Sequence, residues 1–445
     1  MKGTHGNQIH ITLLAALALL PAASCAQAPR LSPFSATATI ATPASSASRY
    51  PAELPSETAV RDALAQLPEL LAVRAGIDYS TAERQRLQSG PYEWSVRGET
   101  AQRRTRIDGN FHEYEITIDR PVRWFGKSRK DGELGQQAIV VADAAYADAW
   151  HEAGRTLLAA WFELLREERA ALRVSEQVTL SGQFLASMQK RVHAGDTPKM
   201  ELLLAQTEHQ RLIAAQQQAE QRVNLARIAL EQKYPNLPLP PVSVSAVPLL
   251  PDIPGDEENI DWVAHIIADN HELEQAQAQV RQKQLLAERS ALERMPDPTV
   301  ALRYTSERSG EDRIIGVGVS IPLPGEARRA GYAGALAQLD QARQEETRVR
   351  NKVEREARQL LAQVIATKKI AATQAQIRDQ AQSNAALVMK AYTLGESAFA
   401  DTLLANRQAL EATQAAETAH LDALELHARL LVDAHQIWSF ESGRK

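Results

Sequence analysis

The stretch KRVHAGDTPKMELLLA at residues 190–205 decides how this chain folds, because it recurs as KAYTLGESAFADTLLA at residues 390–405. Five of the sixteen aligned residues are identical at one fixed offset of 200 positions (390 − 190). Each copy separates two long segments of helical composition, so each predicts a reversal between two helices. Gly195 and Gly395 stand at the reversals, where a left-handed or closely packed backbone favours glycine. The chain is therefore predicted to contain two copies of one structural unit.

Long helices are predicted on both sides of each reversal. Residues 133–193 contain no proline, and as one helix they would reach roughly 90 Å. A second proline-free stretch covers residues 326–394. Returning helices are expected to end near residues 233 and 440. Only 5% of the residues are aromatic, a composition that favours long helices over a large compact core.

A change from helical to alternating periodicity predicts one β-hairpin in each copy. Apolar and polar residues alternate through residues 92–120, with Asp108-Gly109 as a turn signal between two strands. The same alternation occupies residues 298–322 and closes with Pro324-Gly325. Each chain thus supplies four strands, each with one apolar and one polar face. The basic run Lys127–Lys130 after the first hairpin is predicted to be a solvated or headgroup-facing turn.

These elements divide the chain into five segments and give a fold that is mainly α with a small β part. A signal peptide is predicted at residues 1–26 and an extended leader at residues 27–55. The first structural repeat covers residues 56–234 in the order helix, β-hairpin, long helix, helix. A proline-rich connector at residues 235–255 leads to the second repeat at residues 256–440, which has the same order.

The amino terminus has the pattern of a secretory signal peptide. Lys2 is followed by an apolar run from Ile11 to Leu20, which is too short for a membrane-spanning helix. Two processing routes stay open for Cys25: it becomes a lipidated first residue, or it is removed with the signal peptide. Because Cys25 is the single cysteine, no intrachain disulfide can form.

The charge balance and the absence of catalytic signatures exclude several functions. A net charge of −5, with acidic and basic residues intermixed, argues against a dedicated nucleic-acid binder. The strings that begin at His151 and His271 resemble the start of a zincin motif, but Arg155 and Gln275 occupy the positions that require a second histidine. We therefore expect no enzyme activity, no catalytic residues, no cofactor and no metal ligands.

The strand count has a consequence for assembly. Four strands cannot close a barrel, and open strand edges are not tolerated in lipid. If the apolar faces of the strands contact lipid, several chains must share one barrel. The long helices need partners as well, because a lone amphipathic helix leaves its apolar stripe exposed. Packing the helices of several chains side by side into a tube meets both needs.

The order of these elements resembles that of the outer-membrane efflux (TolC-like) family over essentially the whole mature chain. The resemblance is carried by Tyr392–Gly395 with Asp401–Leu404, by the weaker copy Arg191–Gly195 with Glu201–Leu204, and by the strand exits Pro121–Lys127 and Ile321–Gly325. It implies a homotrimer in which long α-helical hairpins form a periplasmic tunnel and the strands contribute to a shared twelve-stranded outer-membrane β-barrel. It also implies contact with outer-membrane lipid, a periplasmic adaptor protein and an inner-membrane pump. The Gly126-Lys127 form resembles the heavy-metal-export branch of this family.

The resemblance also assigns roles to single residues. Gly195, Gly395 and Tyr392 would lie at the hairpin tips that contact the adaptor. Asp401, and more weakly Glu201, would form a tunnel constriction, where three converging carboxylates attract cations and repel one another. The alternative for Asp401 is a solvated helix residue, and Leu404 stands where some relatives carry a second acidic ring.

The strand alternation predicts which side chains line the barrel. The polar faces would turn toward a water-filled lumen and the aromatic residues Trp94, Tyr114 and Tyr304 toward lipid or its interface. The expected lumen residues are Glu93, Arg97, Glu113, Glu115 and Arg303. The alternative is a soluble sheet packed on helices.

Transport of this kind needs no chemistry in the duct itself. The function that fits best is a passive exit duct of a tripartite efflux or export system, with metal cations among its candidate cargoes. The alternative is a periplasmic coiled-coil adaptor or structural protein without a membrane barrel, although such a protein would not need two alternating hairpins.

Overall fold

The structure is a computed structural model that describes residues 53–239 and 261–440. The predicted signal peptide with Cys25, nearly all of the leader and most of the connector lie outside these residues. The described part of the chain contains no helix that is both long and apolar enough to cross a membrane.

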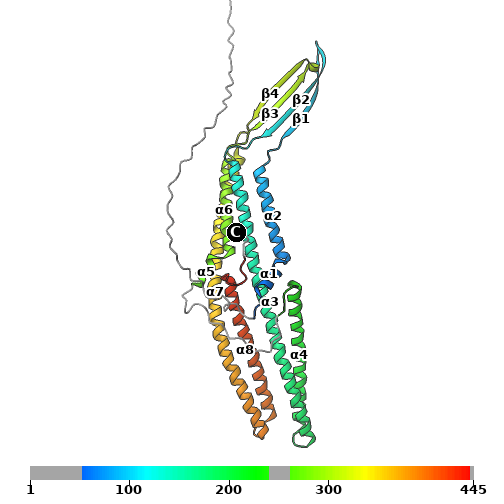
Figure 1. The fold of residues 1–445 in the computed structure, drawn as a ribbon, viewed down its shortest axis with the longest axis vertical. Coiled ribbons are helices and arrows are strands. Elements are labelled where there is room, and N and C mark those ends of the chain that lie inside the picture. The colour runs from blue at the N-terminus through cyan, green and yellow to red at the C-terminus, as the bar shows by residue number, and fades with distance from the viewer. Residues whose placement is uncertain (1–52, 240–260, 441–445) are drawn as a thin grey trace, which may run out of the picture. The chain divides into compact units, whose positions relative to one another are not determined.

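The four predicted strands form one antiparallel sheet in the order β1-β2-β3-β4 (Figure 1). Val96 of β1 lies opposite Ile118 of β2, which lies opposite Leu302 of β3, which in turn lies opposite Val317 of β4. Since opposite residues share a face, this register collects the apolar positions of all four strands on one side. The strands are β1 (Ser95–Thr105), β2 (Gly109–Pro121), β3 (Thr299–Glu307) and β4 (Asp312–Ser320).

Within the described residues each repeat also contains four α-helices, of which the last two are the long ones of one hairpin in the first repeat and of the other hairpin in the second. The first repeat has α1 (Glu57–Ala65), α2 (Pro68–Ser89), α3 (Lys127–His193) and α4 (Lys199–Lys233). The second repeat has α5 (Trp262–Ala268), α6 (His271–Leu292), α7 (Glu326–Leu394) and α8 (Phe399–Asp433). The prediction of a mainly α fold with four strands and long helical hairpins is confirmed.

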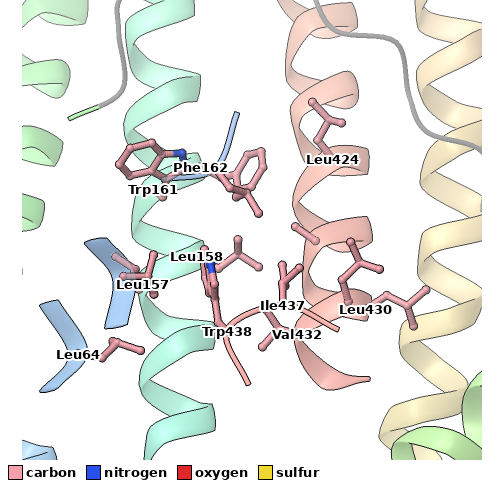
Figure 2. Close-up of a cluster of buried hydrophobic side chains, with 14 of the residues drawn as sticks. Leu64, Leu157, Leu158, Trp161, Phe162, Leu424, Leu430, Val432, Ile437 and Trp438 are labelled. Carbon is pink, nitrogen blue, oxygen red and sulfur yellow. The ribbon is translucent and has the colours of Figure 1, made fainter. Parts of the chain in front are cut away.

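The long helix α3 connects the two repeats. It packs against α2 and α4 of its own repeat and against α6 and α8 of the other, while α7 packs against α6 and α8. The main hydrophobic core lies where α3 meets α8 (Figure 2). Leu158 and Phe162 of α3 are almost fully buried there, as are Leu430 and Leu431 of α8. Burial of this apolar area is the main term that holds the repeats together.

One sequence expectation about this region was wrong. The basic run Lys127–Lys130 is the first turn of α3 and not a turn before it. The side chain of Lys127 is fully buried, with its Nζ atom 2.9 Å from Asp297 Oδ1 and 3.3 Å from Glu293 Oε2. Both carboxylates come from the second repeat, so the local sequence could not reveal them. A buried ammonium needs such partners, because its desolvation is otherwise very costly.

Candidate functional site

The two helix reversals have the same backbone geometry. Gly195 and Gly395 are both left-handed, with φ of 76° and 82°. The N–H of Asp196 donates to the carbonyl of Arg191 over 2.9 Å, and Glu396 donates in the same way to Ala391 over 2.9 Å. A Cβ atom at either glycine would meet no other atom within 4 Å, so backbone conformation and not space demands glycine there.

The two predicted constriction residues occupy equivalent helix positions. Glu201 and Asp401 both lie in the first turn of their helices, α4 and α8. Asp401 is exposed, and its Oδ2 accepts a hydrogen bond from the N–H of Ala398 at 3.4 Å. In this chain Asp401 thus stabilises the start of α8. The constriction roles of Asp401 and Glu201 stay predictions. Leu404, three residues after Asp401 on α8, is 57% exposed.

Tyr392 joins the two helical hairpins near their tips. Its hydroxyl oxygen accepts a hydrogen bond from Arg191 at the end of α3 over 3.0 Å, and its O–H donates to Glu201 of α4 over 3.4 Å. The guanidinium of Arg191 also lies 5.4 Å from the ring centroid of Tyr392. Burial raises the pKa of Tyr392 above its ordinary value, so the hydroxyl remains a donor at neutral pH. Adaptor contact by Tyr392 stays a prediction. The structure shows in addition that Tyr392 links the two hairpins through Arg191 and Glu201.

A second connection between the hairpins lies deeper, at Glu208 of α4. Its carboxylate accepts hydrogen bonds from Arg211 on the same helix and from Arg407 of α8. Glu208 is only 6% exposed. Burial alone would raise its pKa, but the two guanidinium groups lower the pKa to about 2. The carboxylate therefore stays charged in the folded chain until the pH approaches about 2, and the stabilisation from the ion pair is fully present above about pH 4.5.

Further ion pairs follow the contact between α3 and α8. Arg173, Arg166 and Arg155 of α3 pair with carboxylates of α8 at distances between 2.6 and 3.1 Å. The hydrogen bond to Glu417 raises the pKa of Arg173. The arginines are separated by 11 and 7 residues, which places them on one face of the helix. The acidic partners are Glu417, Asp422, Glu425 and Asp433.

The sheet has one face of paired polar side chains. Arg97, Glu113, Glu115 and Arg303 share this face in the strand register. Arg103 bridges Glu113 at 2.9 Å, and Arg303 lies 3.8 Å from Glu115. The fifth predicted lumen residue, Glu93, lies outside the sheet, since β1 begins at Ser95. Contact of these side chains with a lumen stays a prediction.

The opposite face of the sheet is apolar and open. Val96 is 70% exposed, Ile315 75% and Val317 76%. Tyr114 and Tyr304 lie on the same face, which agrees with the alternation in the sequence. In a soluble sheet these side chains would be covered, so the open face points to a binding surface for lipid or protein.

Sequence reasoning missed the residues that connect the repeats. Glu208 and Arg407 looked like ordinary polar residues on helices, and Arg191 was noted only as the start of the weaker motif copy, since nothing in the local pattern shows what lies across a long-range contact. The one available signal was the spacing of Arg155, Arg166 and Arg173 on one face of a long helix.

No protein-family model and no curated relative matches this sequence. The fold, however, is similar to several solved structures. The outer-membrane channel OprN matches with a TM-score of 0.73 and 15% identity, over 86% of this chain and 90% of that one. The CmeC outer membrane channel of Campylobacter jejuni matches with a TM-score of 0.70 and 12% identity, over 87% and 86%. The open state of the MtrE outer membrane channel of Neisseria gonorrhoeae matches with a TM-score of 0.65 and 16% identity, over 85% and 88%. This chain therefore has the fold of these outer-membrane channels.

Proposed function

We propose that this chain is one subunit of a trimeric outer-membrane channel, the passive exit duct of an efflux or export system. Three copies would share one barrel of strands in the outer membrane, and their helices would extend into the periplasm as a tunnel. An inner-membrane pump would supply the energy through a periplasmic adaptor. The fold likeness to outer-membrane channels supports this proposal.

The observation that carries the proposal is that the sheet has an open apolar face and two unpaired edges within the described residues. Its apolar face is open, its polar face is internally paired, and the outer edges of β1 and β4 pair with no other strand among residues 53–239 and 261–440. In water, such edges and such a face favour aggregation. In a membrane, the apolar face would contact lipid, and the edges would pair with β4 and β1 of neighbouring copies.

The long helices also expose apolar side chains that partner helices could cover. Leu387 of α7 is 67% exposed and Leu225 of α4 is 60% exposed, although both belong to long helices. Exposed apolar side chains on long helices are covered when similar helices pack beside them. Side-by-side packing of three copies would bury these residues at the same time as it closes the barrel.

The proposed transport requires no reaction at the duct. The polar face of the sheet would line the lumen, and the tips near Asp401 would form the narrow periplasmic end. Three Asp401 carboxylates around one axis would favour cations over anions. The Tyr392 and Glu208 connections would hold the two hairpins of each subunit together at that end.

Membrane fractionation tests the proposal. The full chain is expressed with its native amino terminus, the outer membrane is isolated, and the mass of the detergent-extracted oligomer is determined. An outer-membrane trimer is expected. A monomer or dimer in the soluble periplasmic fraction would contradict the channel and leave the coiled-coil adaptor as the better account.

Metal cations are the cargo that we propose to test first, on the resemblance of Gly126-Lys127 to a metal-exporting branch. Lys127 is also explained by structure alone, because its buried side chain pairs with Asp297 and Glu293. Growth of a deletion strain on graded zinc, copper and cobalt tests this cargo. Unchanged metal tolerance combined with lost tolerance to organic toxicants would exclude it.

A further inference from the structure

Three histidines from three different elements meet next to the end of α8. His151 lies in α3, His271 is the first residue of α6, and His435 follows the last turn of α8. The ring centroid of His435 is 5.0 Å from that of His151 and 4.8 Å from that of His271, and the latter two are 6.4 Å apart. Among the described residues, no group of three or more His, Cys, Asp or Glu side chains is arranged to hold a metal ion. Imidazole rings can also accept protons.

His435 differs from the other two in its hydrogen bonding. His151 Nε2 lies 3.2 Å from Asp433 Oδ1, and His271 Nδ1 lies 3.1 Å from Glu274 Oε2. Both ring nitrogens of His435 are buried and have no hydrogen-bond partner within the described part of the chain. The backbone of His435 is left-handed, with φ of 54°. This fold therefore holds an uncharged imidazole at a strained position.

Charges of both signs surround His435 from every neighbouring element. The cavity beside the three rings has a volume of about 30 Å³, and its wall includes Asp148 and Arg155 of α3, Glu272 of α6, Glu356 of α7, and Arg429 and Asp433 of α8. An adjoining open groove of about 620 Å³ adds Asp269, Glu274 of α6 and Arg350 of α7. Lys352 of α7 hydrogen-bonds Glu272 at 2.9 Å. The groove gives protons a route from solvent to the ring.

The balance of these interactions disfavours a charged His435. Burial, and after it the nearby His151 and His271, lower the pKa of His435 from 6.5 to about 4, and Asp269 and Asp433 oppose this effect only in part. The effect of Asp433 is smaller than that of burial, and its carboxylate is already paired with His151 and Arg155. A proton on His435 would be poorly compensated in this position.

The residues that follow His435 are held on α3 by aromatic contacts. Trp150 Nε1 donates a hydrogen bond to the carbonyl of Trp438 over 3.3 Å. The ring of Phe440 lies 5.3 Å from that of Tyr146 and 5.8 Å from that of Trp150. Trp438 reaches the main core beside Leu158, as Figure 2 shows. The segment 435–440 thus closes over the junction between the two repeats.

We propose that His435 is a proton-controlled latch: its neutral ring keeps segment 435–440 docked on α3 and α6, and protonation between His151 and His271 releases the segment. The released ring gains solvent and moves away from two other imidazoles. This inference does not depend on the membrane role proposed above, since every contact that it uses lies within one chain.

The direction of the pH effect follows from linkage. In the released segment His435 would titrate near its ordinary value of 6.5, and in the docked segment near 4. The released form therefore binds more protons between these values, so docking is fully stable above about pH 6.5 and weakens as the pH falls toward 4. The docking equilibrium can fall by roughly 300-fold at most, which corresponds to 2.5 pKa units (6.5 − 4).

Hydrogen exchange read by mass spectrometry tests the latch in the detergent-solubilised full chain between pH 7.5 and 4, after correction for the intrinsic pH dependence of exchange. Peptides covering residues 434–440 should lose protection as the pH falls, by roughly 150-fold at pH 4, where docked His435 is half protonated. In His435→Asn this loss should be absent, because asparagine tolerates the left-handed backbone but does not titrate. The exposed His112 provides the matched control, and His112→Gln should behave like the unmodified chain.

A second variant keeps the test decisive if His435→Asn folds poorly. His271→Gln removes a neighbour that lowers the pKa of docked His435. The loss of protection should therefore still begin near pH 6.5, but it should level off at a higher pH and reach a smaller amplitude. Three results would overturn the latch: constant protection of residues 434–440 in the unmodified chain, the same loss in His435→Asn, or a simultaneous loss throughout α3 and α8. The last of these would indicate global acid unfolding.

Discussion

The carboxylate of Glu208 in α4 accepts hydrogen bonds from Arg407 Nε of α8 at 3.2 and 3.1 Å, and so joins the two helical hairpins of one chain. Glu208 is buried, whereas the side chain of Arg407 is 45% exposed. The pair therefore couples a fixed acceptor to a donor that can leave into solvent. Any movement of α8 away from α4 must break it.

Arg407→Ala should loosen the narrow end of the proposed duct. Because the guanidinium is half exposed, we expect a loss of only about 1 kcal/mol, which makes the separated state of the hairpins roughly fivefold more populated. The measurement is the entry rate of a large hydrophilic antibiotic that the intact outer membrane excludes. Arg211→Ala is the matched control, since Arg211 contacts the same carboxylate from within α4. Equal entry rates in the two variants would contradict this role of Arg407.

Tyr392→Phe should have a smaller effect in the same assay. The change removes one hydroxyl that links Arg191 to Glu201 and keeps the ring packed against Phe399, 5.6 Å away. A loss of about 0.5–1.5 kcal/mol is expected for such a hydrogen bond. Tyr79→Phe on α2 serves as the control, because Tyr79 is 71% exposed. No change in antibiotic entry relative to this control would show that the hydroxyl does not hold the hairpins.

Asp401→Asn should reduce cation selectivity without unfolding the chain. Asparagine still accepts the hydrogen bond from Ala398 N–H at the start of α8, but three negative charges disappear from the trimer axis. The reversal potential of single channels in a planar bilayer under a salt gradient measures the effect. Glu326→Gln, a change at an exposed acid at the other end of α7, should leave selectivity unchanged. If the two variants behave alike, Asp401 is a solvated helix residue.

Lys127→Met should cost far more stability than the neighbouring change Arg129→Met. The first leaves Asp297 and Glu293 without their buried partner, at a cost of about 3–5 kcal/mol. The second removes a side chain that is 75% exposed, and should cost well under about 1 kcal/mol. Thermal unfolding of the purified oligomers compares the two. Similar midpoints would show that the junction between strands and helices does not depend on Lys127.

The fold could be predicted from sequence where local patterns determine it. Gly195 and Gly395 marked the reversals, and proline-free stretches and alternating residues marked the helices and strands. The alternation also sorted Glu115 and Val96 onto opposite faces of the sheet. Boundaries were less accurate, since Glu93 fell outside the strand where it was expected.

The connections between repeats could not be predicted, for a physical reason. Lys127 looked solvated because its partners are more than 160 residues away in sequence. Arg407 and Glu208 are likewise 199 residues apart. Long-range ion pairs depend on which helices pack together, and this depends on the whole fold. The histidine cluster was visible only as two incomplete motifs at His151 and His271.

Cross-linking between strand edges tests the central claim, a sheet shared by several copies, most directly. Val96→Cys on β1 is combined in turn with cysteine at Ile315, Val317 or Val319 on β4, which lie on the same face. Ile116 and Tyr304 are direct partners within one chain, so cysteines at these two positions serve as the intrachain control. Mild oxidation of outer membranes should convert at least one edge pair into covalent dimers and trimers, while the control pair keeps the monomer mass. Monomers alone at every edge pair, with the control pair oxidised, would contradict the shared sheet.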